Sequence, residues 1–238
     1  MNRLFSWPIA RQTARERGLA PPALAITLVL VLLAAGGRPS PGTWSGGASA
    51  FWLALLVLVL GAGLLSSEVE SGHAQLVLLR PITRAAWVGG RLFGSALVVC
   101  LAGAIAWAVG LVAAGARGGF DGSPAWFTLL PIGLLPHLGW LATLAAISAV
   151  TRGWSNAALL VALRFGWFFG RNALPLALPR WNLGPWLLAA DRYFGPQDAV
   201  DAEGIVPSLL FWDVLWFLGA WLLAVLLFNQ RELARRRP

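Results

Sequence analysis

The chain has one cysteine, two histidines and no lysine among its 238 residues. Without lysine it cannot supply the Gly-Lys-Ser/Thr sequence of a P-loop, which excludes ATP hydrolysis by that mechanism. Cys100 has no second cysteine for an internal disulfide or a cysteine-based metal cluster. His73 and His137 are isolated and lack the further ligands that a metal site needs. We therefore expect no catalytic residue, no metal ion and no cofactor bound by this chain.

Charged residues are also scarce, at 12%, whereas 58% of the residues are hydrophobic. A chain with so little polar surface cannot fold as a water-soluble domain, so we interpret it as an integral membrane protein. Its apolar runs approach the roughly 20 residues that a helix needs to cross a bilayer. They predict an all-α membrane domain with about six spans: Pro21–Gly36, Ala48–Leu65, Trp87–Ala114, Trp126–Val150, Trp154–Leu174 and Ser208–Phe228.

All 18 basic residues are arginines, and the net charge is +8. In a soluble protein this excess would suggest nucleic acid, but in a membrane protein it indicates orientation, and we expect no nucleic-acid partner. If six spans alternate, most arginines fall on one side: Arg3, Arg11, Arg15, Arg17, Arg80, Arg84, Arg91, Arg152, Arg231, Arg235, Arg236 and Arg237. The positive-inside rule then places both termini in the cytoplasm. We expect a multi-pass protein of the plasma (inner) membrane.

Two segments flank or interrupt the membrane domain, which we assign to residues 21–238. Residues 1–20 contain an amphipathic stretch, with Ser6 as a candidate N-cap and Gly18 as a C-terminal stop, and are predicted to form an interfacial helix. A solvated basic tail is the alternative. The external segment 175–207 is rich in proline and has two apolar pieces too short to span. It is either re-entrant or a loop packed on the outer surface.

The segment 67–84 lies between the second and third apolar runs and is acidic, amphipathic and ended by Pro81. On a helix, one side would carry Val69, Gly72, Leu76 and Leu79, and another would carry Glu68, Ser71 and Gln75. We expect the first side to meet lipid or the spans. The polar side would be free to dock a soluble partner, because charge pairs fix register. The alternative is a solvated cytoplasmic loop.

Ionisable residues within the fifth and sixth runs are a further signal, because buried charges usually face a bundle interior and need a partner. Arg164 and Arg171 are seven residues apart, so they share a helix face about 10 Å apart along the axis. Arg171 and Asp213 have similar depths and are predicted to pair. Arg164, near the midplane, and His137 remain candidates for substrate or subunit contact. The alternative for Arg164 is a structural role, in contact with backbone carbonyls or a polar neighbour.

The segment 67–84 resembles the cytoplasmic segment of type-2 permeases of ATP-binding cassette (ABC) exporters. The similar residues are Glu68, Glu70, Gly72, Leu76, Leu78, Leu79, Pro81, Arg84 and the pair Gly90-Arg91. The resemblance implies that two permeases form the translocation pathway, as a homodimer or heterodimer among membrane lipids. It also implies separate cytoplasmic ABC ATPase subunits, which bind ATP and Mg. Their contact would be a coupling helix with these residues: Glu68, Glu70, Gly72, Leu76, Arg80, Pro81 and Arg84.

Two other classes remain open from the residues. An intramembrane lipid-modifying enzyme or protease would need convergent acids, or a serine and a histidine, at one depth. Asp213, His137 and Ser148 do not obviously meet that need. A non-transporting scaffold subunit is the other alternative. The substrate stays open, because apolar spans with a few charges suit lipids, amphiphilic drugs, peptides and glycan carriers alike.

Overall fold

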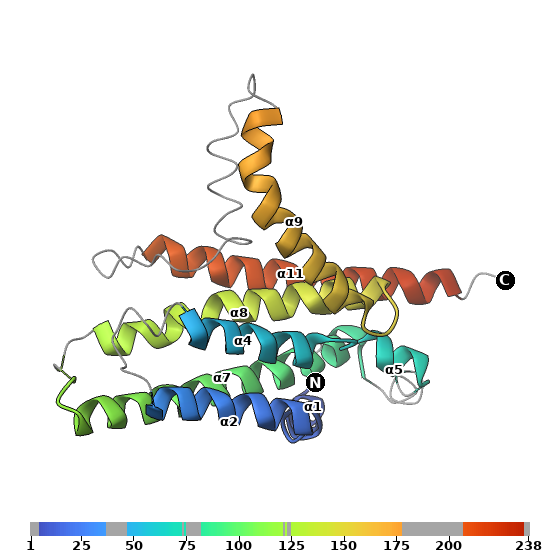
Figure 1. Ribbon diagram of the computed structural model, residues 1–238. Coiled ribbons are helices and arrows are strands. Elements are labelled where there is room, and N and C mark those ends of the chain that lie inside the picture. Colours follow the sequence, from blue (N-terminus) through green and yellow to red (C-terminus); the bar gives the residue numbers. More distant parts are fainter. Residues whose placement is uncertain are drawn as a thin grey trace.

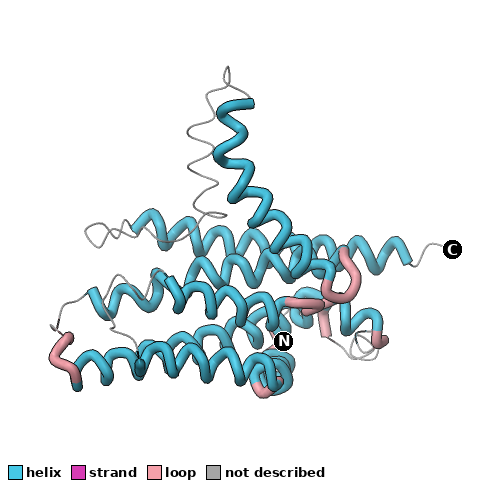
Figure 2. The backbone as a smooth tube through the Cα atoms, viewed as in Figure 1, coloured by secondary structure: helices cyan, strands magenta, loops and turns pink. Residues whose placement is uncertain are grey.

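The computed structural model describes residues 5–36, 47–72, 74, 82–120, 122, 125–177 and 207–235. These residues form helices and a few turns, with no strand among them (Figure 2). The helices are α1 (Trp7–Gly18), α2 (Pro21–Gly36), α4 (Gly47–Gly61), α5 (Ser66–Glu70), α7 (Arg84–Ala116), α8 (Ala125–Val150), α9 (Ser155–Ala177) and α11 (Pro207–Arg235). The expected all-α class is therefore confirmed for the described part of the chain.

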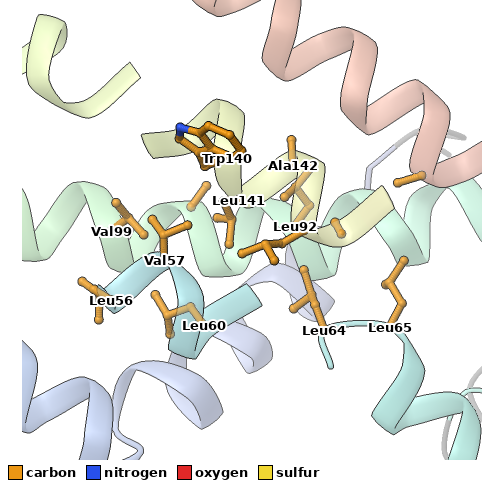
Figure 3. Packing of buried hydrophobic residues seen from close by; sticks show 14 of the residues in the cluster. Leu56, Val57, Leu60, Leu64, Leu65, Leu92, Val99, Trp140, Leu141 and Ala142 are labelled. Carbon is orange, nitrogen blue, oxygen red and sulfur yellow. The ribbon is translucent and has the colours of Figure 1, made fainter. Parts of the chain in front are cut away.

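The long helices α2, α4, α7, α8 and α11 lie side by side as a bundle (Figure 1). Figure 3 shows how Val57 of α4, Leu92 and Val99 of α7, and Leu141 of α8 meet in its interior. Small residues on α7, including Gly103 and Gly110, are buried and let neighbouring helices approach closely. The core is therefore built by residues from several apolar runs of the sequence.

Among the described residues, fewer helices than the six predicted spans are both long enough and apolar enough to cross a membrane. Four stretches of the described residues qualify: Ser49–Glu70, Arg84–Ala116, Gly133–Val150 and Asp213–Gln230. A fifth is obtained if α1 and α2, which bend by 75° at their junction, count as one span. The helix α2 has only 16 residues, short of the roughly 20 that a span needs. The helix α9 is not among these stretches, so six spans remain a prediction.

The helix α1 begins and ends as the sequence predicted, but its apolar face does not lie free at an interface. Ile9, Ala10 and Thr13 are buried, and α1 packs against α7. The reason is a pair of glycines on α7. A Cβ atom at Gly90 would lie 2.8 Å from the Cβ of Ile9, and one at Gly94 would collide with the carbonyl oxygen of Ala10. Only glycine allows this approach.

The helix α9 differs from the others because it projects away from the bundle (Figure 1). Leu159, Leu163 and Phe165 on it are exposed, whereas α11 lies along α8. A Cβ atom at Gly139 of α8 would lie 2.5 Å from the ring of Trp216 on α11. Residues 178–206, which hold most of the predicted external segment 175–207, lie outside the described residues.

Candidate functional site

A charged cluster joins three helices at the end of the bundle where α1 and α5 lie (Figure 1). Arg91 of α7 is 3% exposed. Its Nη1 atom donates to Oε2 of Glu16 on α1 at 3.1 Å, and its Nη2 lies 2.7 Å from Oε2 of Glu68 on α5. The planar guanidinium therefore uses both arms of its fork to hold α1 and α5 against α7. We define the charged cluster as Glu16, Arg17, Glu68 and Arg91.

Arg17, the fourth member of this cluster, hydrogen-bonds to backbone carbonyls at the C-terminal end of α4. Its Nη1 atom donates to the carbonyl oxygens of Leu60 at 2.7 Å and Ala62 at 3.2 Å. The last carbonyls of a helix lack partners within the helix, so these bonds satisfy them. Burial, and then the positive charge of Arg91, lower the pKa of Arg17, whereas Glu68 and Glu16 raise it. The guanidinium stays charged at neutral pH.

A buried amide secures the turn between α4 and α5. Asn156 of α9 is fully buried, and its Oδ1 accepts from the backbone N–H of Gly63 at 3.0 Å. Its Nδ2 donates to the carbonyl oxygens of Gly61 at 2.8 Å and Leu144 at 3.1 Å. Gly63 has a φ of +61°, a conformation that glycine adopts without strain. Asn156 thus ties this turn to both α8 and α9.

The hydroxyl groups of Ser148 and Ser66 form further hydrogen bonds at the start of α5. Ser148 Oγ accepts from the backbone N–H groups of Leu65 at 3.0 Å and Ser66 at 3.1 Å. Ser66 Oγ donates to the carbonyl oxygen of Gly153 at 3.0 Å. The N–H of Gly153 donates to Oε1 of Glu70 at 3.1 Å. We define Ser66, Ser148, Gly153 and Asn156 as the polar joint, which connects the start of α5 to α8, to α9 and to the turn between them.

The structure changes one expectation about the segment 67–84. Glu68 was expected on a face free to meet a partner, but its side chain is 16% exposed and paired with Arg91. The physical reason is that buried Arg91 needs a carboxylate nearby. The helix α5 ends at Glu70, and Gly72 has a φ of +76°, whereas the expected stop at Pro81 lies outside the described residues. A residue with positive φ does not continue a right-handed helix.

The remaining predicted residues of this segment divide into two groups. Glu70 is exposed beside Gly153, and Arg84 is the first residue of α7, whose N-cap Thr83 accepts from the N–H of Ala86. Leu76, Arg80 and Pro81 lie outside the described residues. Sequence reasoning missed Glu16 and Asn156. A signal for Glu16 existed, because an arginine entering an apolar run, as Arg91 does, requires an acidic partner.

His137 and Arg164 are brought together at a second place, between α4, α8 and α9. The guanidinium carbon of Arg164 lies 5.6 Å from the centre of the Trp140 ring. His137 is buried, with Nδ1 2.7 Å from the carbonyl oxygen of Gly133 and Nε2 3.1 Å from that of Ala50. Both residues therefore line one cavity.

Asp213 is buried on α11, but the side chain of Arg171 lies outside the described residues, so their pairing stays a prediction. Ser148 and His137 have different backbone partners, at Leu65 and Ser66 for Ser148 and at Gly133 and Ala50 for His137. Within the described ranges, no group of three His, Cys, Asp or Glu side chains is placed to hold a metal ion.

The sequence was compared with models of known protein families and with curated proteins. The sequence model of the family described as ABC-2 family transporter protein matches residues 7–171, more than half of the chain. That range includes the charged cluster, the polar joint and the cavity beside Arg164. No match was found among curated proteins. The chain belongs to the ABC-2 family of transporter proteins and is a membrane permease of an ABC transporter.

Proposed function

We propose that this permease is half of a dimeric exporter in the plasma membrane, and that its Arg-rich end receives a cytoplasmic ABC ATPase subunit. The observation that carries the proposal is the attachment of α5 on two sides. Glu68 connects it to Arg91 of α7 and, through Arg91, to Glu16 of α1. Glu70 connects it to Gly153 between α8 and α9. A displacement of α5 is therefore passed to helices on both sides of the bundle.

In this mechanism the ATPase binds ATP and Mg, and its closure pushes on the segment 67–84. Ser67, Glu70 and Ser71 are exposed on α5 and its end, and are available to a docking partner. Glu68 acts from within by keeping α5 against α7. Glu70, Gly72 and Arg84 are proposed ATPase contacts, together with Leu76, Arg80 and Pro81. The rest of the permease would alternate between inward-facing and outward-facing states, with both termini in the cytoplasm.

Glu70 gives the sharpest test, because its charge and its hydrogen bond can be separated. Glu70→Gln keeps an acceptor oxygen for the N–H of Gly153, whereas Glu70→Arg removes that acceptor and reverses the charge. We expect Glu70→Arg to reduce copurification of the ATPase with a tagged permease, or to uncouple ATP hydrolysis from transport. Glu70→Gln should have a smaller effect, because only the charge is lost.

The matched control is Arg117→Glu, a charge reversal near the end of α7 that is remote from α5 (Figure 1). It should leave ATPase recovery unchanged even if it weakens the bond from Arg117 to the carbonyl oxygen of Ala35. Full ATPase recovery and normal transport in the Glu70→Arg variant would exclude the proposed docking surface.

A further inference from the structure

The cavity beside Arg164 has a composition that is unusual for the interior of a membrane bundle. It measures about 40 Å³ and lies between α4, α8 and α9. Val57, Leu58 and Val161 contribute apolar walls, and Trp140, His137 and Arg164 contribute the polar groups. A water needs about 10 to 15 Å³ of such space, so the cavity holds a few waters or one small polar group. The cavity is partly open rather than enclosed, and Val161 on its wall is 37% exposed.

Arg164 is the charged donor among the groups that line this cavity. Its guanidinium packs on the ring of Trp140, and no carboxylate among the described side chains lies within ion-pair distance of it. A ring face attracts the cation but accepts few of its five N–H donors. An arginine between apolar walls is therefore suited to an anion with two or more oxygens, which its planar fork contacts in parallel.

His137 does not compete for that anion. Both of its ring nitrogens already face backbone carbonyl oxygens, one on its own helix and one on Ala50 of α4. The ring thereby links α8 to the start of α4 and supports the wall of the cavity. We assign His137 a positioning role and Arg164 the ligand-binding role.

The surroundings favour a ligand with an apolar tail. Val161 lies three residues before Arg164 and therefore on the same face of α9, where it is exposed, and Leu58 and Leu160 line the cavity with it. Arg164 lies about two and a half turns along α9 from Ser155, away from the Arg-rich end. A small hydrated anion has no favourable contact with these side chains, whereas an acyl chain does.

We propose that the Arg164 cavity binds the headgroup of an anionic amphiphile, a phosphate or a carboxylate, whose hydrocarbon chain lies along α9. The interpretation of this cavity as a substrate site rests on the proposed transport function. The binding itself requires no ATPase. Headgroup oxygens would face the guanidinium, and the nearby ring of Trp140 would help to keep that guanidinium in place.

The test is a titration of the full-length permease, purified in dodecyl maltoside, followed by native mass spectrometry. The probes are decyl phosphate, decanoate, decylphosphocholine with the same chain and a zwitterionic head, and inorganic phosphate. We expect one or both anionic amphiphiles to bind about tenfold or more tightly than decylphosphocholine, as a hydrogen-bonded charge pair implies. Inorganic phosphate should bind more weakly than decyl phosphate, because it has no chain.

Arg164→Gln should remove this preference, and Arg164→Lys should keep part of it. Arg152→Gln is the matched control, since Arg152 is exposed in the turn before α9 and is remote from the cavity. Ala54→Leu supplies a second variant that fills the cavity without touching the charge, and it should also weaken binding. Circular dichroism and size-exclusion chromatography establish that each variant is folded.

Equal binding of anionic and zwitterionic amphiphiles would overturn the proposal, as would equal losses in Arg164→Gln and Arg152→Gln. Inorganic phosphate that binds as tightly as decyl phosphate would replace the amphiphile with a free anion and also overturn it. None of these results bears on ATPase recovery in the Glu70 variants. Failure of this inference is therefore distinguishable from failure of the proposed function.

Discussion

Two arginines of the permease, Arg91 on α7 and Arg164 on α9, have opposite surroundings. Arg91 is 3% exposed and has carboxylates from two other helices at 2.7 and 3.1 Å. Arg164 has the face of Trp140 and, among the described side chains, no carboxylate within ion-pair distance. A buried cation that is already paired fixes the relative position of the helices around it. A cation next to apolar walls and an open cavity is instead available to an external anion.

The largest expected effect comes from breaking the paired arginine. Arg91→Leu leaves Glu68 poorly compensated in a partly buried place, and removal of one partner from a buried pair costs about 3–5 kcal/mol. We expect a loss near the lower limit, because the side chain of Glu16 is 46% exposed and solvent screens it. Unfolding in mixed detergent, monitored by circular dichroism, measures this loss.

The comparison with Arg164 provides the control for that experiment. Arg164→Leu should destabilise the permease much less than Arg91→Leu, because it leaves no carboxylate of the described residues without its partner. Adding Glu68→Leu to Arg91→Leu should recover part of the lost stability. Equal losses in the two single variants, or no recovery in the double variant, would contradict the contrast between the two sites.

The polar joint is expected to be the next most sensitive feature. Asn156→Leu removes the acceptor of the N–H of Gly63 and one donor from each of the carbonyls of Gly61 and Leu144, although the Gly61 carbonyl keeps the N–H of Leu64. Unsatisfied buried groups of this kind cost about 1–3 kcal/mol each, and relaxation of the turn should limit the total to about 2–3 kcal/mol. Thermal unfolding measures this loss. Ser155→Ala, at the exposed neighbouring position, should change the unfolding temperature little; comparable shifts would exclude a special role for Asn156.

A smaller loss should follow from a methyl group between α1 and α7. Gly94→Ala places its Cβ against the carbonyl of Ala10 and 2.7 Å from the Cβ of Thr13, so α1 must shift. Overpacking of this kind costs about 1–3 kcal/mol, reduced here by the better helix propensity of alanine. Gly115→Ala on the same helix has no neighbouring atom within 4 Å and should be neutral or stabilising. Protease resistance of the N-terminal helix distinguishes the two variants, and identical digestion would refute the close contact.

A small effect on stability is expected from changing the ring beside Arg164. Trp140→Phe keeps an aromatic face but weakens the cation–π contact, which contributes about 0.5–1 kcal/mol, and it leaves a small gap against Trp216 because Trp140 is buried. We expect a loss of about 1 kcal/mol in the free energy of unfolding, while the affinity for decyl phosphate falls because the guanidinium is less well oriented. A large loss of stability with unchanged affinity would make Trp140 a packing residue.

Several features of the fold were predictable because they depend on local sequence. Ser6, Pro8 and Gly18 indicated the bounds of α1, and the apolar runs indicated the long helices. The resemblance of the acidic segment 67–84 to ABC permeases was visible in the sequence. The inward direction of the Glu68 side chain was not predicted. A periodic pattern assigns residues to the faces of a helix. It does not show which of those residues will pair with a charge that is distant in the sequence, such as Arg91.

The polar joint was unpredictable for a similar reason. Asn156 is 93 residues from Gly63 in the sequence, and nothing in its immediate neighbours distinguishes it from an ordinary residue at the start of a helix. The cavity was partly anticipated, since Arg164 and His137 were singled out as polar residues in apolar runs. Their meeting depends on how α4, α8 and α9 pack, which hydrophobic periodicity alone does not determine.

The close contact between α1 and α7 also has a consequence for biosynthesis. The ribosome makes α1 first, yet the arginine that binds Glu16 follows it by 75 residues, and the carbonyl that binds Arg17 follows by 43. Until those residues have emerged and entered the bilayer, the newly made helix has no docking place on the protein. The amphipathic sequence of α1 favours a position at the membrane surface during this interval, and α1 can dock on α7 only after α7 has been made.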